Sequence, residues 1–156
     1  MKILLTGSSG LLGSDIAVEG ARQNLTITGA CRHPSKHFEI EADITKDGIA
    51  KIANLDFDCI IHSAAWRDPD ECERDREGAY AMNVRATENL AKIAREKNAA
   101  FLYISTDYVF SGENPPYDEQ SVSCPVNYYG ETKLLGEKTV LKEIPNAVIL
   151  RVPLLY

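Results

Sequence analysis

The sequence predicts an α/β fold, a doubly wound sheet of parallel strands with helices on both faces. Short apolar runs alternate along the chain with longer segments in which apolar residues recur at helical spacing. This alternation is typical of repeated βαβ units. In addition, Gly7, Gly10 and Gly13 separate the first apolar run from the first helical segment. Doubly wound folds make a tight strand-to-helix turn at that place.

The elements follow from these runs in chain order. Each expected strand is a short apolar run: Lys2 to Thr6, Leu25 to Ala30, Phe38 to Glu41, Phe57 to His62, Ala99 to Ser105 and Ala147 to Val152. Each expected helix shows the longer period: Leu11 to Gln23, Lys46 to Asn54, Glu77 to Lys97 and Pro125 to Glu143. Because no repeat, low-complexity tract or linker interrupts this order, we expect residues 1–156 to form a single domain.

Two polar stretches are predicted as loops. Ser111 to Pro125 is rich in Gly, Pro, Asn, Ser and acidic residues, and a loop of this length is usually kept for function. The acidic run from Asp68 to Glu73 could imitate a cluster of metal ligands, but we favour a solvated loop that leads into the next helix. Trp66, beside this run, either covers a sugar or nicotinamide ring or packs in a partly buried position.

Composition excludes several classes of protein. Lys and Arg contribute 17 charges and Asp and Glu 23, a net charge of −6, which argues against a nucleic-acid partner. The N-terminal apolar run is too short for a signal peptide, and no run approaches the ~20 apolar residues that span a bilayer. We therefore expect no membrane partner and a cytoplasmic location. Neither the four cysteines nor the three histidines have metal-ligand spacing, so no metal is expected.

The glycine loop Thr6-Gly7-Ser8-Ser9-Gly10-Leu11-Leu12-Gly13 predicts a dinucleotide site. Glycines between a strand and a helix let the backbone approach a pyrophosphate at the helix N-terminus. The alternative is a tight turn that binds no ligand. The residue that accepts from the ribose hydroxyls of NAD normally follows about twenty residues later, where this chain has Cys31-Arg32-His33. Because a guanidinium favours a 2′-phosphate, Arg32 predicts NADP(H), with NAD(H) as the alternative cofactor, unless it is simply a solvated loop arginine.

Tyr129 and Lys133 predict proton chemistry. Helical residues four apart lie on one face, so the Lys133 ammonium is expected beside the Tyr129 phenol, where it favours the ionised form. A tyrosine tuned in this way can act as an acid near neutral pH.

Together these motifs resemble the extended short-chain dehydrogenase/reductases, and within them the dTDP-4-dehydrorhamnose reductase (RmlD-like) branch. The resemblance covers the whole chain and depends on five stretches: Thr6 to Gly13, Asp43-Ile44, Ser63-Ala64-Ala65, Ser105 to Phe110, and Tyr129-x-x-x-Lys133. It implies an NAD(P)-binding Rossmann fold and NADP-dependent reduction of a 4-keto-6-deoxy sugar nucleotide in dTDP-rhamnose biosynthesis.

The resemblance also implies residue roles. Thr106 hydrogen-bonds the substrate carbonyl, Tyr129 donates the proton and Lys133 binds the nicotinamide ribose. The other implied cofactor residues come from the glycine loop, from the segments that follow the third and fourth strands, and from the long helix after them: Gly7, Ser9, Gly10, Leu11, Leu12, Gly13, Asp43, Ile44, Ser63, Ala64, Ala65 and Asn83. Asp43 and Ile44 match an adenine contact, whereas Ala64, Ala65 and Asn83 match positions that line the cofactor or steady the active site.

Alternatives stay open at several of these positions. Ser105 takes the role of Thr106 if the loop shifts by one residue. Asp43 could instead cap the helix near Lys46, and Asn83 could be an ordinary polar residue on a helix face. Tyr128 has no lysine four residues later, so we expect it in packing or at the surface. His62 stands where the reductase branch commonly has asparagine.

A second resemblance offers another class of function. The regulatory β subunit of methionine adenosyltransferase is similar in three stretches: Asn114-Pro115-Pro116-Tyr117, Gly136-Glu137-Lys138 and Arg151 to Tyr156. This implies an NADP-binding regulator that docks on a catalytic enzyme. A nucleotide-sugar epimerase or dehydratase is a third alternative, although those branches usually differ before the tyrosine.

The reductase family builds most of its substrate pocket from a C-terminal region beyond the strand that ends at Val152. We therefore expect this chain to be an N-terminal fragment that holds the cofactor site without most of that pocket, and that binds NADP(H) but turns over little substrate or none. The expected partners are a nucleotide-sugar substrate and either a second copy of the chain or a catalytic enzyme.

Overall fold

Six parallel strands form the predicted sheet, in the order β3-β2-β1-β4-β5-β6. The computed structural model describes residues 1–153, and its strands are β1 (Lys2–Thr6), β2 (Thr26–Cys31), β3 (Glu39–Glu41), β4 (Cys59–His62), β5 (Ala100–Thr106) and β6 (Val148–Val152). The chain moves outward from β1 to β3, returns to β4 and then moves outward in the opposite direction. In open parallel sheets such a reversal opens a crevice at the carboxyl ends of the strands.

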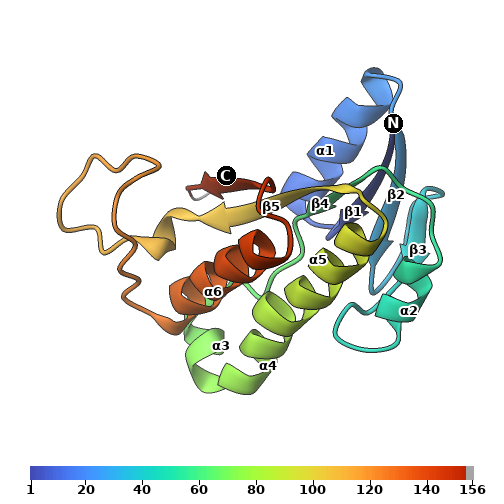
Figure 1. Ribbon diagram of the computed structural model, residues 1–156. Helices are drawn as coiled ribbons and strands as arrows, with labels where there is room; N and C mark the ends of the chain where they lie inside the picture. The colour runs from blue at the N-terminus through green and yellow to red at the C-terminus, as the bar shows by residue number, and fades with distance from the viewer. Residues whose placement is uncertain (154–156) are drawn as a thin grey trace.

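Helices cover both faces of the sheet, which confirms the doubly wound class. Figure 1 shows α1 on one face and α4, α5 and α6 on the other. The helices are α1 (Leu11–Arg22), α2 (Gly48–Ala53), α3 (Pro69–Arg74), α4 (Arg76–Tyr80), α5 (Ala86–Glu96) and α6 (Tyr128–Glu143). A π-helical turn, η1 (Ala81–Arg85), joins α4 to α5, and a short 3-10 turn, η2 (Asp107–Val109), follows β5.

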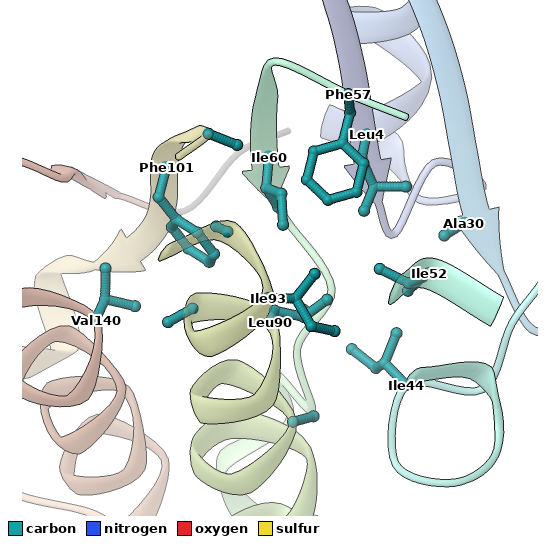
Figure 2. Close-up of a cluster of buried hydrophobic side chains, with 14 of the residues drawn as sticks. Leu4, Ala30, Ile44, Ile52, Phe57, Ile60, Leu90, Ile93, Phe101 and Val140 are labelled. Atoms are coloured by element: carbon teal, nitrogen blue, oxygen red, sulfur yellow. The ribbon is translucent and has the colours of Figure 1, made fainter. Parts of the chain in front are cut away.

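The main core lies between the sheet and the helices on the α5 side. The parallel register aligns Leu4 with Ile60 and Ile60 with Phe101, and all three side chains are buried. Figure 2 shows Leu90 and Ile93 of α5 facing this row. Burial of each such side chain stabilises the fold by about 2 kcal/mol. A slip of one residue would turn the row to the other face, so the core fixes the register and aligns the carboxyl ends of β1, β4 and β5.

The acidic run from Asp68 to Glu73 is a helix, and its prediction as a loop was wrong. The Asp68 carboxylate accepts a hydrogen bond from the Glu71 amide at 2.9 Å, and Pro69 occupies the first turn of α3. An aspartate cap, a proline in the first turn and acidic residues near the helix N-terminus all favour a helix start. Cys72 anchors α3 because its side chain is completely buried.

The helices on the α5 side also differ from the predictions at their ends. The single helix expected from Glu77 to Lys97 begins at Arg76 and contains the π-helical turn η1. The helix expected from Pro125 begins at Tyr128, because the Asn127 side chain accepts from the Gly130 amide at 2.8 Å and caps α6 there. Pro125 therefore belongs to the loop that Figure 1 shows projecting beyond the carboxyl end of β5.

No helix in the described part of the chain is both long and apolar enough to span a bilayer.

Candidate functional site

A cleft of about 520 Å³ opens at the carboxyl edge of the sheet. It brings together most of the site residues predicted from the sequence. The predicted residues that line it are Gly7, Ser9, Gly10, Leu11, Leu12, Arg32, Asp43, Ile44, Ser63, Ala64, Ala65, Thr106, Tyr129 and Lys133. The glycine loop and the tyrosine-lysine pair, more than a hundred residues apart in sequence, thus share one cavity.

Gly13 and Asn83 lie outside the cleft lining. A Cβ on Gly13 would fall 2.2 Å from the Gly7 carbonyl oxygen, so only glycine lets α1 pack this closely on its own loop. Asn83 is buried behind the wall, where its amide donates to the Trp66 carbonyl (2.9 Å) and accepts from the Trp66 amide (2.8 Å). Of its two predicted roles, Asn83 is placed to steady the site rather than to line it.

The N-terminus of α1 has no side-chain cap. Its N-cap residue, Gly10, has no side chain to satisfy the first amide groups. Gly7 adopts a φ of 71° and donates to the Ala30 carbonyl at 3.0 Å, which fixes the turn against β2. Amide groups left without a side-chain acceptor, at the positive end of a helix, attract phosphate oxygens.

The outer end of the cleft carries Arg32 and Asp43. Arg32 is exposed and lines the cavity directly after β2. Asp43 does not cap α2, which begins at Gly48. Its carboxylate accepts from the Thr45 hydroxyl (2.6 Å) and amide (3.0 Å), and these bonds, the hydroxyl first, hold its pKa below the ordinary value. Asp43 is therefore ionised at neutral pH at the edge of the cleft.

The end of β5 separates the roles of Ser105 and Thr106. The Ser105 hydroxyl donates to the buried Glu137 carboxylate at 2.5 Å. The Thr106 hydroxyl donates to Asp107 and accepts from the Tyr108 amide, both at 3.2 Å, beside the Tyr129 phenol. The Ser105 hydroxyl is held by a short bond to a buried carboxylate, whereas Thr106 makes a longer bond to the exposed Asp107 and lies beside the Tyr129 phenol, so Thr106 is the better placed hydroxyl.

Glu137 also ties the edge strand to the long loop before α6. The Arg151 guanidinium donates to both Glu137 carboxylate oxygens, at 2.9 and 2.7 Å, and to the Ser123 hydroxyl at 3.2 Å. This bidentate pair is mostly buried, and such pairs hold their geometry well. The loop therefore stays attached beside the cleft. Of the stretch from Arg151 to Tyr156 that carries the second resemblance, residues 154–156 lie outside the described residues.

Tyr129 has a raised pKa, so the prediction that Lys133 favours its ionised form was wrong. Burial raises the pKa of the phenol, and the Thr106 hydroxyl opposes this only in part. The Lys133 ammonium donates instead to the Ile104 carbonyl at 2.7 Å and lies 4.0 Å from the centre of the Tyr103 ring. The spacing correctly predicts one helix face, but loss of water from the phenol decides the direction of the shift.

Lys133 is itself almost fully buried, with 2% of its surface exposed. Burial lowers its pKa from 10.5 to about 7, and the Glu137 carboxylate opposes the change. Between these two values the unfolded chain binds more protons at this residue than the folded protein does. The contribution of Lys133 to stability should therefore rise with pH across that window.

We expect the difference in unfolding free energy between the wild type and Lys133→Met to shift in favour of the wild type as the pH rises from 7 toward 10.5. Urea unfolding at several pH values measures this difference, and other titrating groups cancel in it. Lys138→Met, an exposed change on the same helix, is the matched control. A difference for Lys133→Met that stays constant with pH would contradict the burial of the ammonium.

The neighbouring aromatic residues pack outside the cleft lining. The Tyr128 ring lies under the Arg76 guanidinium, 4.6 Å from the ring centre, as expected for a packing residue. Trp66 donates from its indole to Glu71 at 3.2 Å, which favours its packing alternative. Lining residues to which the sequence assigned no role include Arg67, Asp107 and Tyr108. Asp107 and Tyr108 lie inside the Ser105 to Phe110 stretch that carries the resemblance, and Arg67 lies two residues after Ala65, so extending the Ser63-Ala64-Ala65 motif by two residues could have found it.

Within residues 1–153, no group of three or more His, Cys, Asp or Glu residues is arranged to hold a metal ion.

The comparisons with known proteins agree on the fold and diverge on function. Residues 1–156 match the family model described as the RmlD substrate binding domain. The chain is 41% identical over 158 residues to methionine adenosyltransferase 2 subunit beta of Pongo abelii, covering 99% of this chain and 47% of that protein. A solved dTDP-4-dehydrorhamnose reductase from Bacillus anthracis, in complex with NADP, is 30% identical with a TM-score of 0.86, covering 99% of this chain and 54% of that one.

A hypothetical dTDP-4-dehydrorhamnose reductase from Sulfolobus tokodaii is 32% identical, with a TM-score of 0.91, over 98% of this chain and 56% of that one. The chain thus spans about half the length of the relatives that it matches.

Proposed function

The chain belongs to the RmlD substrate binding domain family, and from this premise we propose that it is the NADP(H)-binding part of a reductase. A similar reductase was solved in complex with NADP. In this proposal the dinucleotide lies along the cleft and NAD(H) is the weaker alternative. The substrate is a 4-keto-6-deoxy sugar nucleotide, as in the similar dTDP-4-dehydrorhamnose reductases.

The residues of the cleft fit a dinucleotide. The uncapped N-terminus of α1 offers amide groups to a pyrophosphate. The backbone around Gly7 leaves no room for a side chain, since a Cβ there would lie 2.8 Å from the Ala64 amide nitrogen. Arg32 lines the cavity after β2, where a guanidinium can bind a 2′-phosphate through two parallel hydrogen bonds.

The other end of the cleft supplies the proton. NADPH, when bound, supplies the hydride that reduces the substrate carbonyl. Tyr129 is protonated at neutral pH because its pKa is raised, and it donates its proton to the carbonyl oxygen as negative charge develops there. The Thr106 hydroxyl, beside the phenol, hydrogen-bonds the same oxygen. Lys133 binds the nicotinamide ribose through its ammonium group.

The observation that carries this proposal is one cavity lined by both the glycine loop and the set of Thr106, Tyr129 and Lys133. The test is a titration of the purified protein with NADPH and NADH, followed by addition of a 4-keto-6-deoxy sugar nucleotide. We expect tighter binding of NADPH than of NADH, with little or no consumption by this chain because most of the substrate pocket is expected outside it. Consumption of NADPH when the sugar is added would support the reductase directly, and failure to bind either dinucleotide would overturn the proposed site.

A second function is favoured by the 41% identity to the β subunit of methionine adenosyltransferase 2. In that case the chain binds NADP(H) and docks on a catalytic adenosyltransferase. Co-purification with such an enzyme, together with no consumption of NADPH by sugar nucleotides, would support the regulatory function. The reverse pair of results would support the reductase.

Replacing Arg32 with Ala should weaken NADPH binding by about tenfold or more, because charge-assisted hydrogen bonds to the 2′-phosphate are lost. NADH lacks this phosphate, so its affinity should change little. Fluorescence titration with both dinucleotides measures the ratio. Arg22→Ala, another exposed arginine that lies on α1 away from the cleft lining, is the control. An unchanged preference in Arg32→Ala would remove Arg32 from the site.

A further inference from the structure

His62 lies at the carboxyl end of β4, directly behind the cleft, and is 1% exposed. Its Nδ1 atom lies 2.6 Å from the Thr6 hydroxyl, and its Nε2 atom lies 3.0 Å from the Thr87 hydroxyl. Thr6 is the last residue of β1 before the glycine loop, and Thr87 belongs to α5. The imidazole therefore bridges the strand that carries the glycine loop to a helix on the far side of the core.

The hydrogen bonds around His62 have one consistent direction. Burial lowers the pKa of His62 to about 3, so the ring is neutral and carries a single N–H. The Thr87 hydroxyl donates to the Asn83 carbonyl at 2.8 Å, so it can only accept from His62 Nε2–H. Nδ1 is then an acceptor and takes the Thr6 proton. The Thr6 oxygen in turn accepts from the Ala64 amide at 3.3 Å.

The same network continues to the other wall of the cleft. The Asn83 side chain donates to the Thr132 hydroxyl at 3.0 Å, and this hydroxyl donates to the Tyr129 carbonyl at 2.8 Å. Asn83 also holds both backbone groups of Trp66. Buried groups therefore link the Ala64 amide, at the glycine-loop wall, to the backbone of Tyr129.

We propose that His62 is a positioning residue that fixes the two walls of the cleft relative to each other by linking Thr6 to Thr87 and Asn83. The inference deepens the proposed dinucleotide site and rests on it. His62 and Thr87 do not line the cleft. They act on a ligand only through the residues that they hold, Ala64 on one wall and Tyr129 on the other.

Thr87→Val is the sharpest test, because valine keeps the shape of the side chain and removes its hydroxyl. The change leaves His62 Nε2–H and the Asn83 carbonyl without this partner. NADPH affinity should fall by about three- to tenfold, the range for one neutral hydrogen bond. Thr87→Ser restores the hydroxyl and should return the affinity to within about twofold of the wild type. Thr28→Val, a half-buried change in β2 outside the cleft lining, is the control.

His62→Gln and His62→Asn separate the two halves of the bridge. The glutamine amide reaches the position of Nε2 and serves Thr87, whereas the shorter asparagine amide reaches the position of Nδ1 and serves Thr6. The His62→Asn variant has already lost its hydrogen bond to Thr87, so adding Thr87→Val should change its NADPH affinity little. The His62→Gln variant retains that hydrogen bond, so adding Thr87→Val should lower its NADPH affinity further.

A ligand-free measurement keeps this inference separate from the proposed function. Hydrogen exchange at the Ala64 amide should accelerate about three- to tenfold in Thr87→Val and recover in Thr87→Ser. Failure of the wild type to bind NADPH would overturn the dinucleotide site, and the exchange rates would still decide whether the link exists. Variants that melt at lower temperature but keep both the NADPH affinity and the Ala64 exchange of the wild type would reduce His62 to a packing residue.

Discussion

The Tyr129→Phe variant should lose about 10²- to 10⁴-fold in kcat for carbonyl reduction, the usual contribution of a positioned general acid. Phenylalanine keeps the ring and removes only the group that donates the proton. Because the pKa of Tyr129 is raised by burial, the wild-type phenol is protonated and ready to donate throughout the neutral pH range. The NADPH affinity of the Tyr129→Phe variant should match that of the wild type, since the glycine loop and Arg32 are unchanged.

The measurement is a steady-state assay of NADPH consumption with a 4-keto-6-deoxy sugar nucleotide, paired with an NADPH titration. Tyr128→Phe is the matched control, because that neighbouring ring packs under Arg76 and is absent from the cleft lining. Full turnover by Tyr129→Phe would remove Tyr129 from the reaction. If the protein is instead a regulatory subunit, the substitution should leave its effect on the catalytic partner unchanged.

Gly7→Ala should cause the largest loss of stability among these variants. Its φ of 71° costs a non-glycine residue about 1–2 kcal/mol. A Cβ at this position would also lie 2.8 Å from the Ala64 nitrogen and 2.9 Å from the Ala64 Cα, and forcing an atom into packed backbone costs about 1–3 kcal/mol more. The free energy of unfolding should fall by the sum of these terms, and NADPH binding should be lost with the turn.

Gly112→Ala separates the two causes. Gly112 has a similar φ of 83°, yet a Cβ there would meet nothing within 4 Å. It should therefore show only the backbone cost of about 1–2 kcal/mol and bind NADPH normally. Urea unfolding of both variants measures the comparison, and equal losses would mean that the contact between the glycine loop and Ala64 is looser than the structure shows.

The parts of the fold that sequence predicted well are those that depend on local pattern. The strands follow from apolar runs, and the glycine loop follows from Gly7, Gly10 and Gly13. Both signals determine the conformation of the backbone only within a few residues. Thr106 could be placed at the cleft because it ends β5 and parallel strands share a carboxyl edge, whereas Tyr129 and Lys133, on α6, were placed beside it by the family resemblance. The helix at Pro69–Arg74 could also have been predicted from Asp68 and Pro69 at its start, but the acidic charges of the run favoured a solvated loop instead.

Other features arise from contacts that are distant in sequence. The direction of the Tyr129 pKa shift depends on burial, which the spacing to Lys133 does not contain. His62 bonds to Thr6, which is 56 positions away in sequence, and to Thr87, which is 25 positions away. The π-helical turn belongs to the same class, because the Asn83 side chain inside it bonds to residues 17 and 49 positions away.

That turn has a consequence for how the site can change over time. A π-helical turn accommodates about one residue more than a regular turn, and each helical residue advances the chain by about 100° around the axis. Losing a single codon between Ala81 and Arg85 would therefore convert this turn into a regular one and leave α4 and α5 in nearly the same phase. The cost would fall on Asn83, whose side chain reaches Trp66 and Thr132 from within the wider turn. The support behind the cleft can thus be gained or erased by one in-frame insertion or deletion, while the helices on either side keep their packing.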